Sequence, residues 1–189
     1  MNFIILHGLG KKPTEEWYTN LSTELKDKGH NVFVPQLPCC FKPNLDKTYK
    51  FLTSKYKLNE NTVLIGHSSG ASLVLGILQK LPDNIVIKKA ILVAGFSNPN
   101  LTELLHNYVP KEDYKDLFPK KWNWKKIKAS AKMFVIIYCP TDPYVQPSHS
   151  IGIYKKVGGK LIAINNAGHF GVSTGGEKYI TFKELHKYL

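Results

Sequence analysis

The chain of 189 residues contains no arginine: all 26 of its basic residues are lysines, set against 14 acidic residues, and the formal net charge is +12. Such a charge suggests an anionic partner such as nucleic acid. Specific reading of phosphate or guanine, however, usually relies on the bidentate hydrogen bonds of arginine, which lysine cannot make. The lysines are also scattered, so we expect a solvated surface and no specific nucleic-acid partner.

Cysteine is scarce as well. The three cysteines, Cys39, Cys40 and Cys139, are odd in number and show neither a C-x-x-C pair nor a Cys/His spacing typical of a metal site. A disulfide between adjacent cysteines would be strained. We therefore expect free thiols and no metal, with a reactive cysteine near the active site as the less favoured alternative.

Long hydrophobic runs are missing too. No apolar stretch approaches the roughly 20 residues that span a bilayer. The first eight residues, Met1–Gly8, carry neither a basic leader nor a small-residue cleavage site. These features predict a soluble cytoplasmic protein that does not use a membrane as a partner.

Six short apolar runs predict buried strands, and because they are nearly continuous rather than alternating they favour a parallel sheet. The predicted strands are 3–6, 32–34, 63–65, 90–93, 134–138 and 161–164. Stretches with helical spacing lie between them, at 15–28, about 45–56, 69–81, 148–157 and 177–189. This alternation predicts the α/β class, as a three-layer α/β/α sandwich with a mostly parallel central sheet of about six strands.

The length fits one domain, 1–189. One segment, from Gly95 to about Lys126, shows no sustained period and contains three prolines. It is too short for a domain of its own and too long for an ordinary connection. We expect 95–126 to form a small cap over the strand ends.

A G-x-S-x-G sequence, Gly66 to Gly70, lies between the third predicted strand and the following helix. This is the context of a nucleophile elbow, a sharp strained turn that exposes a serine hydroxyl at the top of a sheet. Ser68 is the candidate nucleophile. The backbone N–H of Ser69, at the start of the helix, is a candidate oxyanion donor.

A nucleophilic serine needs a base and a carboxylate that orients the base. In the order typical of α/β-hydrolases, the acid follows a later strand and the histidine follows the last one. Asp142 and His169 stand at these positions. Asp142 could instead cap a turn, His169 could be a surface loop residue and G-x-S-x-G could be a chance match, but their agreement in type and order favours a catalytic triad.

The second oxyanion donor should come from a loop after the first strand. His7-Gly8-Leu9-Gly10 stands there, and the N–H of Leu9 is the candidate. A dinucleotide-binding turn is the alternative, but G-x-G-x-x-G is not present. We therefore expect neither a nucleotide nor any other organic cofactor.

With these residues in place, the chain resembles the YdeN-like and retinoblastoma-binding-protein-9-like family of small serine hydrolases, within the α/β-hydrolase superfamily. The resemblance spans nearly the whole chain and rests on short motifs: His7-Gly8, Trp17-Tyr18, Pro35-Gln36-Leu37-Pro38, Ile65 to Ala71, Trp122-Asn123-Trp124, Thr141 to Val145 and Ala167 to Phe170. It implies an α/β-hydrolase fold with Ser68, Asp142 and His169 as the triad. An L-x-C-x-E motif for docking on pocket proteins is absent, so no protein partner of that kind is expected.

Together these features predict a serine hydrolase, a carboxylesterase acting on small acyl esters through an acyl-enzyme. We expect Phe96, Trp122 and Phe170 to form a confined apolar substrate pocket. An amidase or peptidase would use the same three residues, and a binding protein that keeps the fold with a vestigial triad is the alternative from another class.

Overall fold

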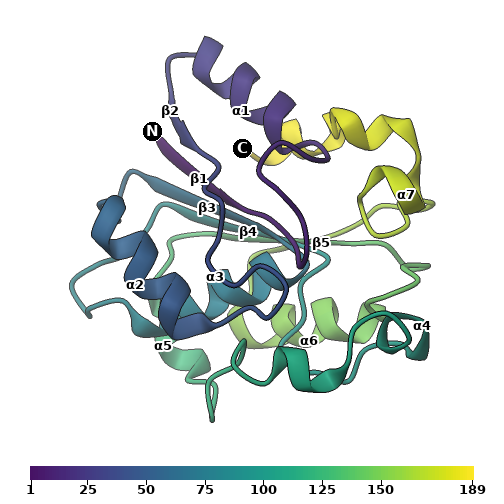
Figure 1. The fold of residues 1–189 in the computed structure, drawn as a ribbon. Coiled ribbons are helices and arrows are strands. Elements are labelled where there is room, and N and C mark those ends of the chain that lie inside the picture. The colour runs from purple at the N-terminus through teal and green to yellow at the C-terminus, as the bar shows by residue number, and fades with distance from the viewer.

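The computed structural model describes all residues, 1–189, and its centre is a sheet of six parallel strands in the order β2-β1-β3-β4-β5-β6 (Figure 1). The strands are β1 (Asn2–Leu6), β2 (Asn31–Phe33), β3 (Thr62–His67), β4 (Lys89–Val93), β5 (Phe134–Tyr138) and β6 (Lys160–Ala163). The predicted α/β-hydrolase fold and parallel sheet are confirmed.

The strand sequences explain why the sheet has helices on both faces. Successive side chains of a strand point to opposite faces, and both faces of β3 are buried along its whole length. Leu64 joins one core cluster, whereas Val63 and Ile65 join another. The sheet therefore separates two hydrophobic cores.

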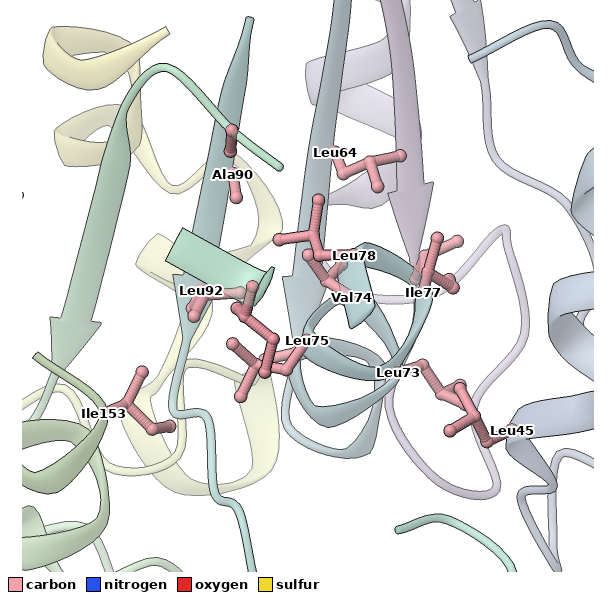
Figure 2. Close-up of a cluster of buried hydrophobic side chains, with 14 of the residues drawn as sticks. Leu45, Leu64, Leu73, Val74, Leu75, Ile77, Leu78, Ala90, Leu92 and Ile153 are labelled. Carbon is pink, nitrogen blue, oxygen red and sulfur yellow. The ribbon is translucent and has the colours of Figure 1, made fainter. Parts of the chain in front are cut away.

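The larger core lies under the helices α2 (Leu45–Lys55), α3 (Ser69–Lys80), α5 (Trp124–Ala129) and α6 (Pro147–Val157). Figure 2 shows side chains of α3 packed between the strands β3 and β4, which carry Leu64 and Leu92, and the helix α2, where Leu73 lies beside Leu45. Every residue of α3 from Ser69 to Leu78 is buried. The helix that follows the candidate nucleophile is thus enclosed by the rest of the molecule.

The opposite face is covered by α1 (Tyr18–Asp27) and by the C-terminal segment, which lie together on one side of the sheet in Figure 1. The predicted helix 177–189 is wrong: the chain forms two short 3-10 helices, η2 (Glu177–Ile180) and η3 (Lys183–Tyr188). Phe182 lies between them with a φ of 44° and its side chain fully buried. The backbone conformation that buries this ring interrupts the helix at Phe182.

Helix α1 also begins three residues later than predicted, at Tyr18 instead of Glu15. The reason is Glu16, whose φ of 55° is incompatible with a right-handed helix. This conformation places the Glu16 carboxylate on the backbone N–H of Val172.

The segment 95–126 contains α4 (Glu103–His106) and η1 (Lys111–Tyr114). It is attached to the rest of the molecule at several points. The Thr102 hydroxyl donates to the carbonyl of Pro143 at 2.7 Å, and the backbone N–H of Leu45 donates to the carbonyl of Asp116 at 2.8 Å. We call this segment the cap.

The composition also led to expectations about membrane-spanning segments and cysteine pairing. None of the helices combines the length and the apolar character that a membrane span requires. All three cysteines are unpaired, Cys139 buried and Cys39 exposed.

Candidate active site

Ser68 lies in a sharp turn between β3 and α3, with φ 55° and ψ −122°. Its backbone N–H donates to the carbonyl of Val93, at the end of the neighbouring strand, at 2.8 Å. A Cβ on Gly66 would overlap the backbone of α3, and one on Gly70 would overlap the backbone of β1. The turn is therefore closed so tightly that glycine is needed on both sides of Ser68.

The side chains of Ser68, His169 and Asp142 form one hydrogen-bonded chain. The Nε2 of His169 is 2.9 Å from the Oγ of Ser68, and its Nδ1 is 2.8 Å from the Oδ2 of Asp142. Because the carboxylate accepts, the Nδ1 of His169 carries the proton and Nε2 is left to accept from the serine hydroxyl. The structure thus brings together the three residues that the sequence singled out.

The carboxylate of Asp142 is itself held by its loop. Its Oδ1 accepts from the backbone N–H groups of Tyr144, at 2.8 Å, and Val145, at 3.0 Å. Only 2% of the Asp142 side chain is exposed, against 14% for His169. One oxygen of the acid therefore fixes the loop, while the other is left for the imidazole.

Two backbone N–H groups next to Ser68 are free to bind a developing oxyanion. Ser69 is the first residue of α3, so its N–H has no acceptor within the helix. The N–H of Leu9 has no protein acceptor, although its neighbours are held: Gly8 donates to the Tyr18 hydroxyl at 3.3 Å, and Gly10 donates to the carbonyl of Cys40 at 2.9 Å. Both Leu9 and Ser69 line the cavity described below.

Two further histidines lie beneath the site and are neutral. The Nε2 of His7 accepts from the backbone N–H of Leu37 at 3.1 Å, and burial lowers the pKa of His7. His67 is fully enclosed, and burial, followed by the nearby His169, lowers the pKa of His67 to about 3. No three histidine, cysteine or carboxylate side chains converge as metal ligands.

A cavity of about 270 Å³ opens above Ser68, and half of its 14 lining residues are hydrophobic. The cap supplies most of the apolar wall, through Leu105, Tyr108, Val109 and Tyr114. Burial raises the pKa of Tyr114 to about 12, so its hydroxyl is protonated. The cap therefore contributes most of the hydrophobic lining, while the polar lining comes from the loops around Ser68 and His169.

Of the three predicted pocket residues, only Phe96 lines the cavity. Trp122 lies outside it: its indole N–H donates to the carbonyl of Ser97 at 2.7 Å, and its ring stacks on Trp124. Phe170 is wrongly predicted for a different reason. Its side chain is buried in the core on the opposite face of the sheet, against Tyr179 and Phe182.

Sequence reasoning missed the residues that form most of the wall. Leu105, Tyr108, Val109 and Tyr114 fall within the predicted cap, but nothing in that aperiodic segment says which of its side chains face the cavity. Tyr144, whose ring meets the imidazole of His169 edge-on at 5.2 Å, was close enough to Asp142 in sequence to be a candidate.

Comparison with known proteins agrees with this geometry. The chain is 27% identical to the protein YdeN of Bacillus subtilis (strain 168), over 88% of this chain and 84% of that one. It is 22% identical to the serine hydrolase RBBP9 of Rattus norvegicus, over 87% and 83%. The crystal structure of the B. subtilis ydeN product shares the fold, with a TM-score of 0.85 at 23% identity, covering 98% of this chain and 95% of that one. The family model described as serine hydrolase matches residues 3–186, and the chain belongs to this family.

Proposed function

We propose that the protein is a carboxylesterase acting on small acyl esters, with Ser68 as nucleophile, His169 as general base and Asp142 as the acid that orients it. One observation carries this proposal: a continuous hydrogen-bonded chain of these three side chains begins at a serine in a strained elbow and ends on a buried carboxylate. Membership of the serine hydrolase family supports the same chemistry.

The first half-reaction transfers the acyl group to the enzyme. The Nε2 of His169 takes the hydroxyl proton as Ser68 Oγ attacks the ester carbonyl. The negative charge that develops on the carbonyl oxygen is bound by the N–H groups of Leu9 and Ser69. Asp142 stabilises the imidazolium, which then gives its proton to the departing alcohol as the C–O bond breaks.

The second half-reaction returns the enzyme to its starting state. His169 takes a proton from a water molecule, whose oxygen attacks the acyl carbon. The same two N–H groups bind the second oxyanion. The tetrahedral species collapses, the bond to Ser68 Oγ breaks, and the proton on His169 returns to that oxygen. The carboxylic acid leaves.

The cavity supports a small substrate. Its volume of about 270 Å³ is slightly below that of typical ligand sites, which measure about 300–1,000 Å³. The apolar wall formed by Leu105, Val109 and Tyr114 suits the acyl part of the substrate. We therefore propose a short acyl or aryl group, in a small-molecule ester.

The decisive experiment is labelling with a fluorophosphonate, which reacts with activated serines. The wild type should take up one equivalent, located on Ser68 by mass spectrometry, and hydrolyse short esters. Ser68→Ala should lose both properties. Ser148→Ala, at an exposed serine outside the cavity, is the matched control and should behave as the wild type.

A second measurement addresses the bond that is cleaved. Matched ester and amide substrates with the same acyl group should differ strongly in kcat/KM, in favour of the ester. Comparable kcat/KM values for the two substrates would contradict the esterase proposal and favour an amidase or peptidase with the same triad. A folded wild type that takes up no label and hydrolyses neither substrate would favour a binding protein.

A further inference from the structure

We propose that Glu16, Trp17 and Tyr18, together with His67, are positioning residues. They hold the loop that carries His169 so that its imidazole stays within hydrogen-bonding distance of Ser68. We call these four residues the α1 clamp. The proposal rests on the function proposed above, because it assigns a catalytic consequence to the position of His169. Glu16, Trp17 and Tyr18 do not line the cavity, whereas His67 does, so the three consecutive residues act on catalysis through the backbone segments that they bind.

Two members of the clamp bind the backbone of the loop directly. The carboxylate of Glu16 accepts from the N–H of Val172 at 2.7 Å. The indole N–H of Trp17 donates to the carbonyl of Phe170 at 3.1 Å, across 153 positions of sequence. The loop is thereby held by one donor and one acceptor on the same short segment, immediately beyond His169.

The other two members reach the backbone of His169 itself, His67 directly and Tyr18 through His67. The Nε2 of His67 is 2.8 Å from the carbonyl oxygen of His169, and because a carbonyl can only accept, this nitrogen carries the proton. The Nδ1 of neutral His67 must then accept, and the hydroxyl of Tyr18 lies 2.7 Å from it. The proton positions along this chain are fully determined.

The chain also reaches the proposed oxyanion loop. The Tyr18 oxygen accepts from the backbone N–H of Gly8, next to Leu9. One tyrosine hydroxyl therefore connects the loop of Leu9 with the residue before the nucleophile and, through it, with the backbone of the base.

Burial gives these contacts their effect. Trp17 and Tyr18 are completely buried and His67 is 2% exposed, so no solvent replaces a lost partner. Burial keeps His67 neutral by lowering its pKa and keeps Tyr18 protonated by raising its pKa. The network therefore has a single arrangement of protons, in which every hydrogen bond to the loop is satisfied.

The first test removes one hydroxyl. Tyr18→Phe keeps the ring but leaves Gly8 N–H and His67 Nδ1 without a partner. We expect kcat for a short ester to fall about 10- to 100-fold with KM within about twofold, as for a misplaced catalytic group. Tyr179→Phe is the matched control, because the buried Tyr179 hydroxyl has no hydrogen-bond partner, and it should keep the wild-type kcat.

The second test restores the donor. His67→Ala should lower kcat strongly, whereas His67→Gln, whose amide N–H can reach the carbonyl of His169, should recover a large part of the loss. Amide hydrogen exchange should become faster at 169–172 in Tyr18→Phe and in Trp17→Phe, but not in Tyr179→Phe.

Three results would overturn the clamp. Unchanged exchange at 169–172 in both variants would show that the contacts do not hold the loop. Faster exchange with an unchanged kcat would show a structural role only. Equal kcat values for His67→Gln and His67→Ala would show that the hydrogen bond donated to the carbonyl of His169 does not matter for catalysis. Failure of the hydrolase proposal is distinguished from these, because it would appear as a folded wild type that takes up no fluorophosphonate and hydrolyses no ester, or as turnover that persists in Ser68→Ala, whatever the exchange rates.

Discussion

The two sides of the cavity are built in different ways. On one side, Ser68 and Asp142 follow the ends of β3 and β5, and His169 lies in the loop after β6. The backbone N–H of Ser68 is hydrogen-bonded to β4, and both Asp142 and His169 are held by hydrogen bonds that are at least partly buried. We call this side the platform.

The other side is the cap. Its two short helices bury little, because no residue of α4 is buried and η1 buries only Tyr114, while Phe96, Leu101 and Leu117 attach the rest of the segment to the core. Segments with few buried contacts open more easily than the central strands of a sheet. We therefore expect the platform to fix the positions of the proposed reacting groups and the cap to determine which substrates reach them.

The largest effect should come from breaking the platform's chemistry without breaking its structure. In Asp142→Asn, the amide oxygen can still accept from Tyr144 and Val145, but the amide nitrogen would face His169 Nδ1 with a donor. The imidazole must then carry its proton on Nε2, where it cannot accept from Ser68. We expect kcat to fall about 10³- to 10⁴-fold.

Thermal unfolding separates this effect from misfolding. Asp142→Asn should unfold within a few degrees of the wild type, whereas Asp142→Ala, which also removes the acceptor for the two loop N–H groups, should be clearly less stable. An Asp142→Asn enzyme with wild-type kcat would show that the acid only supports the loop.

The platform is also the part of the molecule that its sequence predicts best. Continuous apolar runs define the strands because their residues are buried on both faces, and β5 matches its predicted range without change. Since parallel strands end at the same edge, the order of Ser68, Asp142 and His169 along the chain was enough to place them near one another.

The cap and the C-terminal segment were predicted less well for physical reasons. Which side chains of an aperiodic segment face a cavity depends on tertiary contacts, as with Leu105 and Trp122. Similarly, the helical spacing of 177–189 gave no sign that Phe182 would adopt a positive φ to bury its ring. Local propensity was overridden in both places by packing.

The second largest effect concerns the stability of the platform at acidic pH. Burial lowers the pKa of His67 in the folded protein to about 3, from 6.5 in the unfolded chain. Between these values the unfolded chain binds a proton that the folded protein does not, so the free energy of unfolding falls as the pH drops below about 6.5. The slope from this residue approaches about 1.4 kcal/mol per pH unit.

Denaturant unfolding from pH 7 to pH 4 measures this slope. The pKa values of His7 and His149 are also lowered by burial, so both contribute in the same direction. The difference between the wild type and His67→Gln isolates His67, and the variant should show the flatter profile. If the wild type and the variant showed the same dependence of unfolding free energy on pH, the pKa of His67 would not be lowered in the folded protein.

A smaller effect is expected from the cap, and it should appear in selectivity. Leu105→Ala removes a half-buried part of the cavity wall. We expect kcat/KM for a short acyl ester to fall about tenfold, as for the loss of one or two methylene contacts, while longer acyl chains lose less. Fluorophosphonate labelling of Ser68 should remain complete.

The neighbouring residue provides the control. Leu104 is 44% exposed and does not line the cavity, so Leu104→Ala should leave the acyl-chain preference unchanged. If Leu105→Ala instead abolished labelling, the cap would be part of the reacting geometry, and the division between platform and cap would fail.

The smallest effect should come from the ion pair that joins the cap to the loop before α2. Lys42 Nζ lies 3.1 Å from Asp113 Oδ1, but the lysine side chain is 77% exposed, and such pairs contribute about 0.2–1 kcal/mol. Lys42→Ala should therefore change the free energy of unfolding by less than about 1 kcal/mol, with little change in kcat/KM. The cap keeps its other attachments, through Thr102 and Asp116. A large loss of activity that also appeared in the wild type at high salt would mean that surface charge sets the cap's position, and selectivity would then depend on ionic strength.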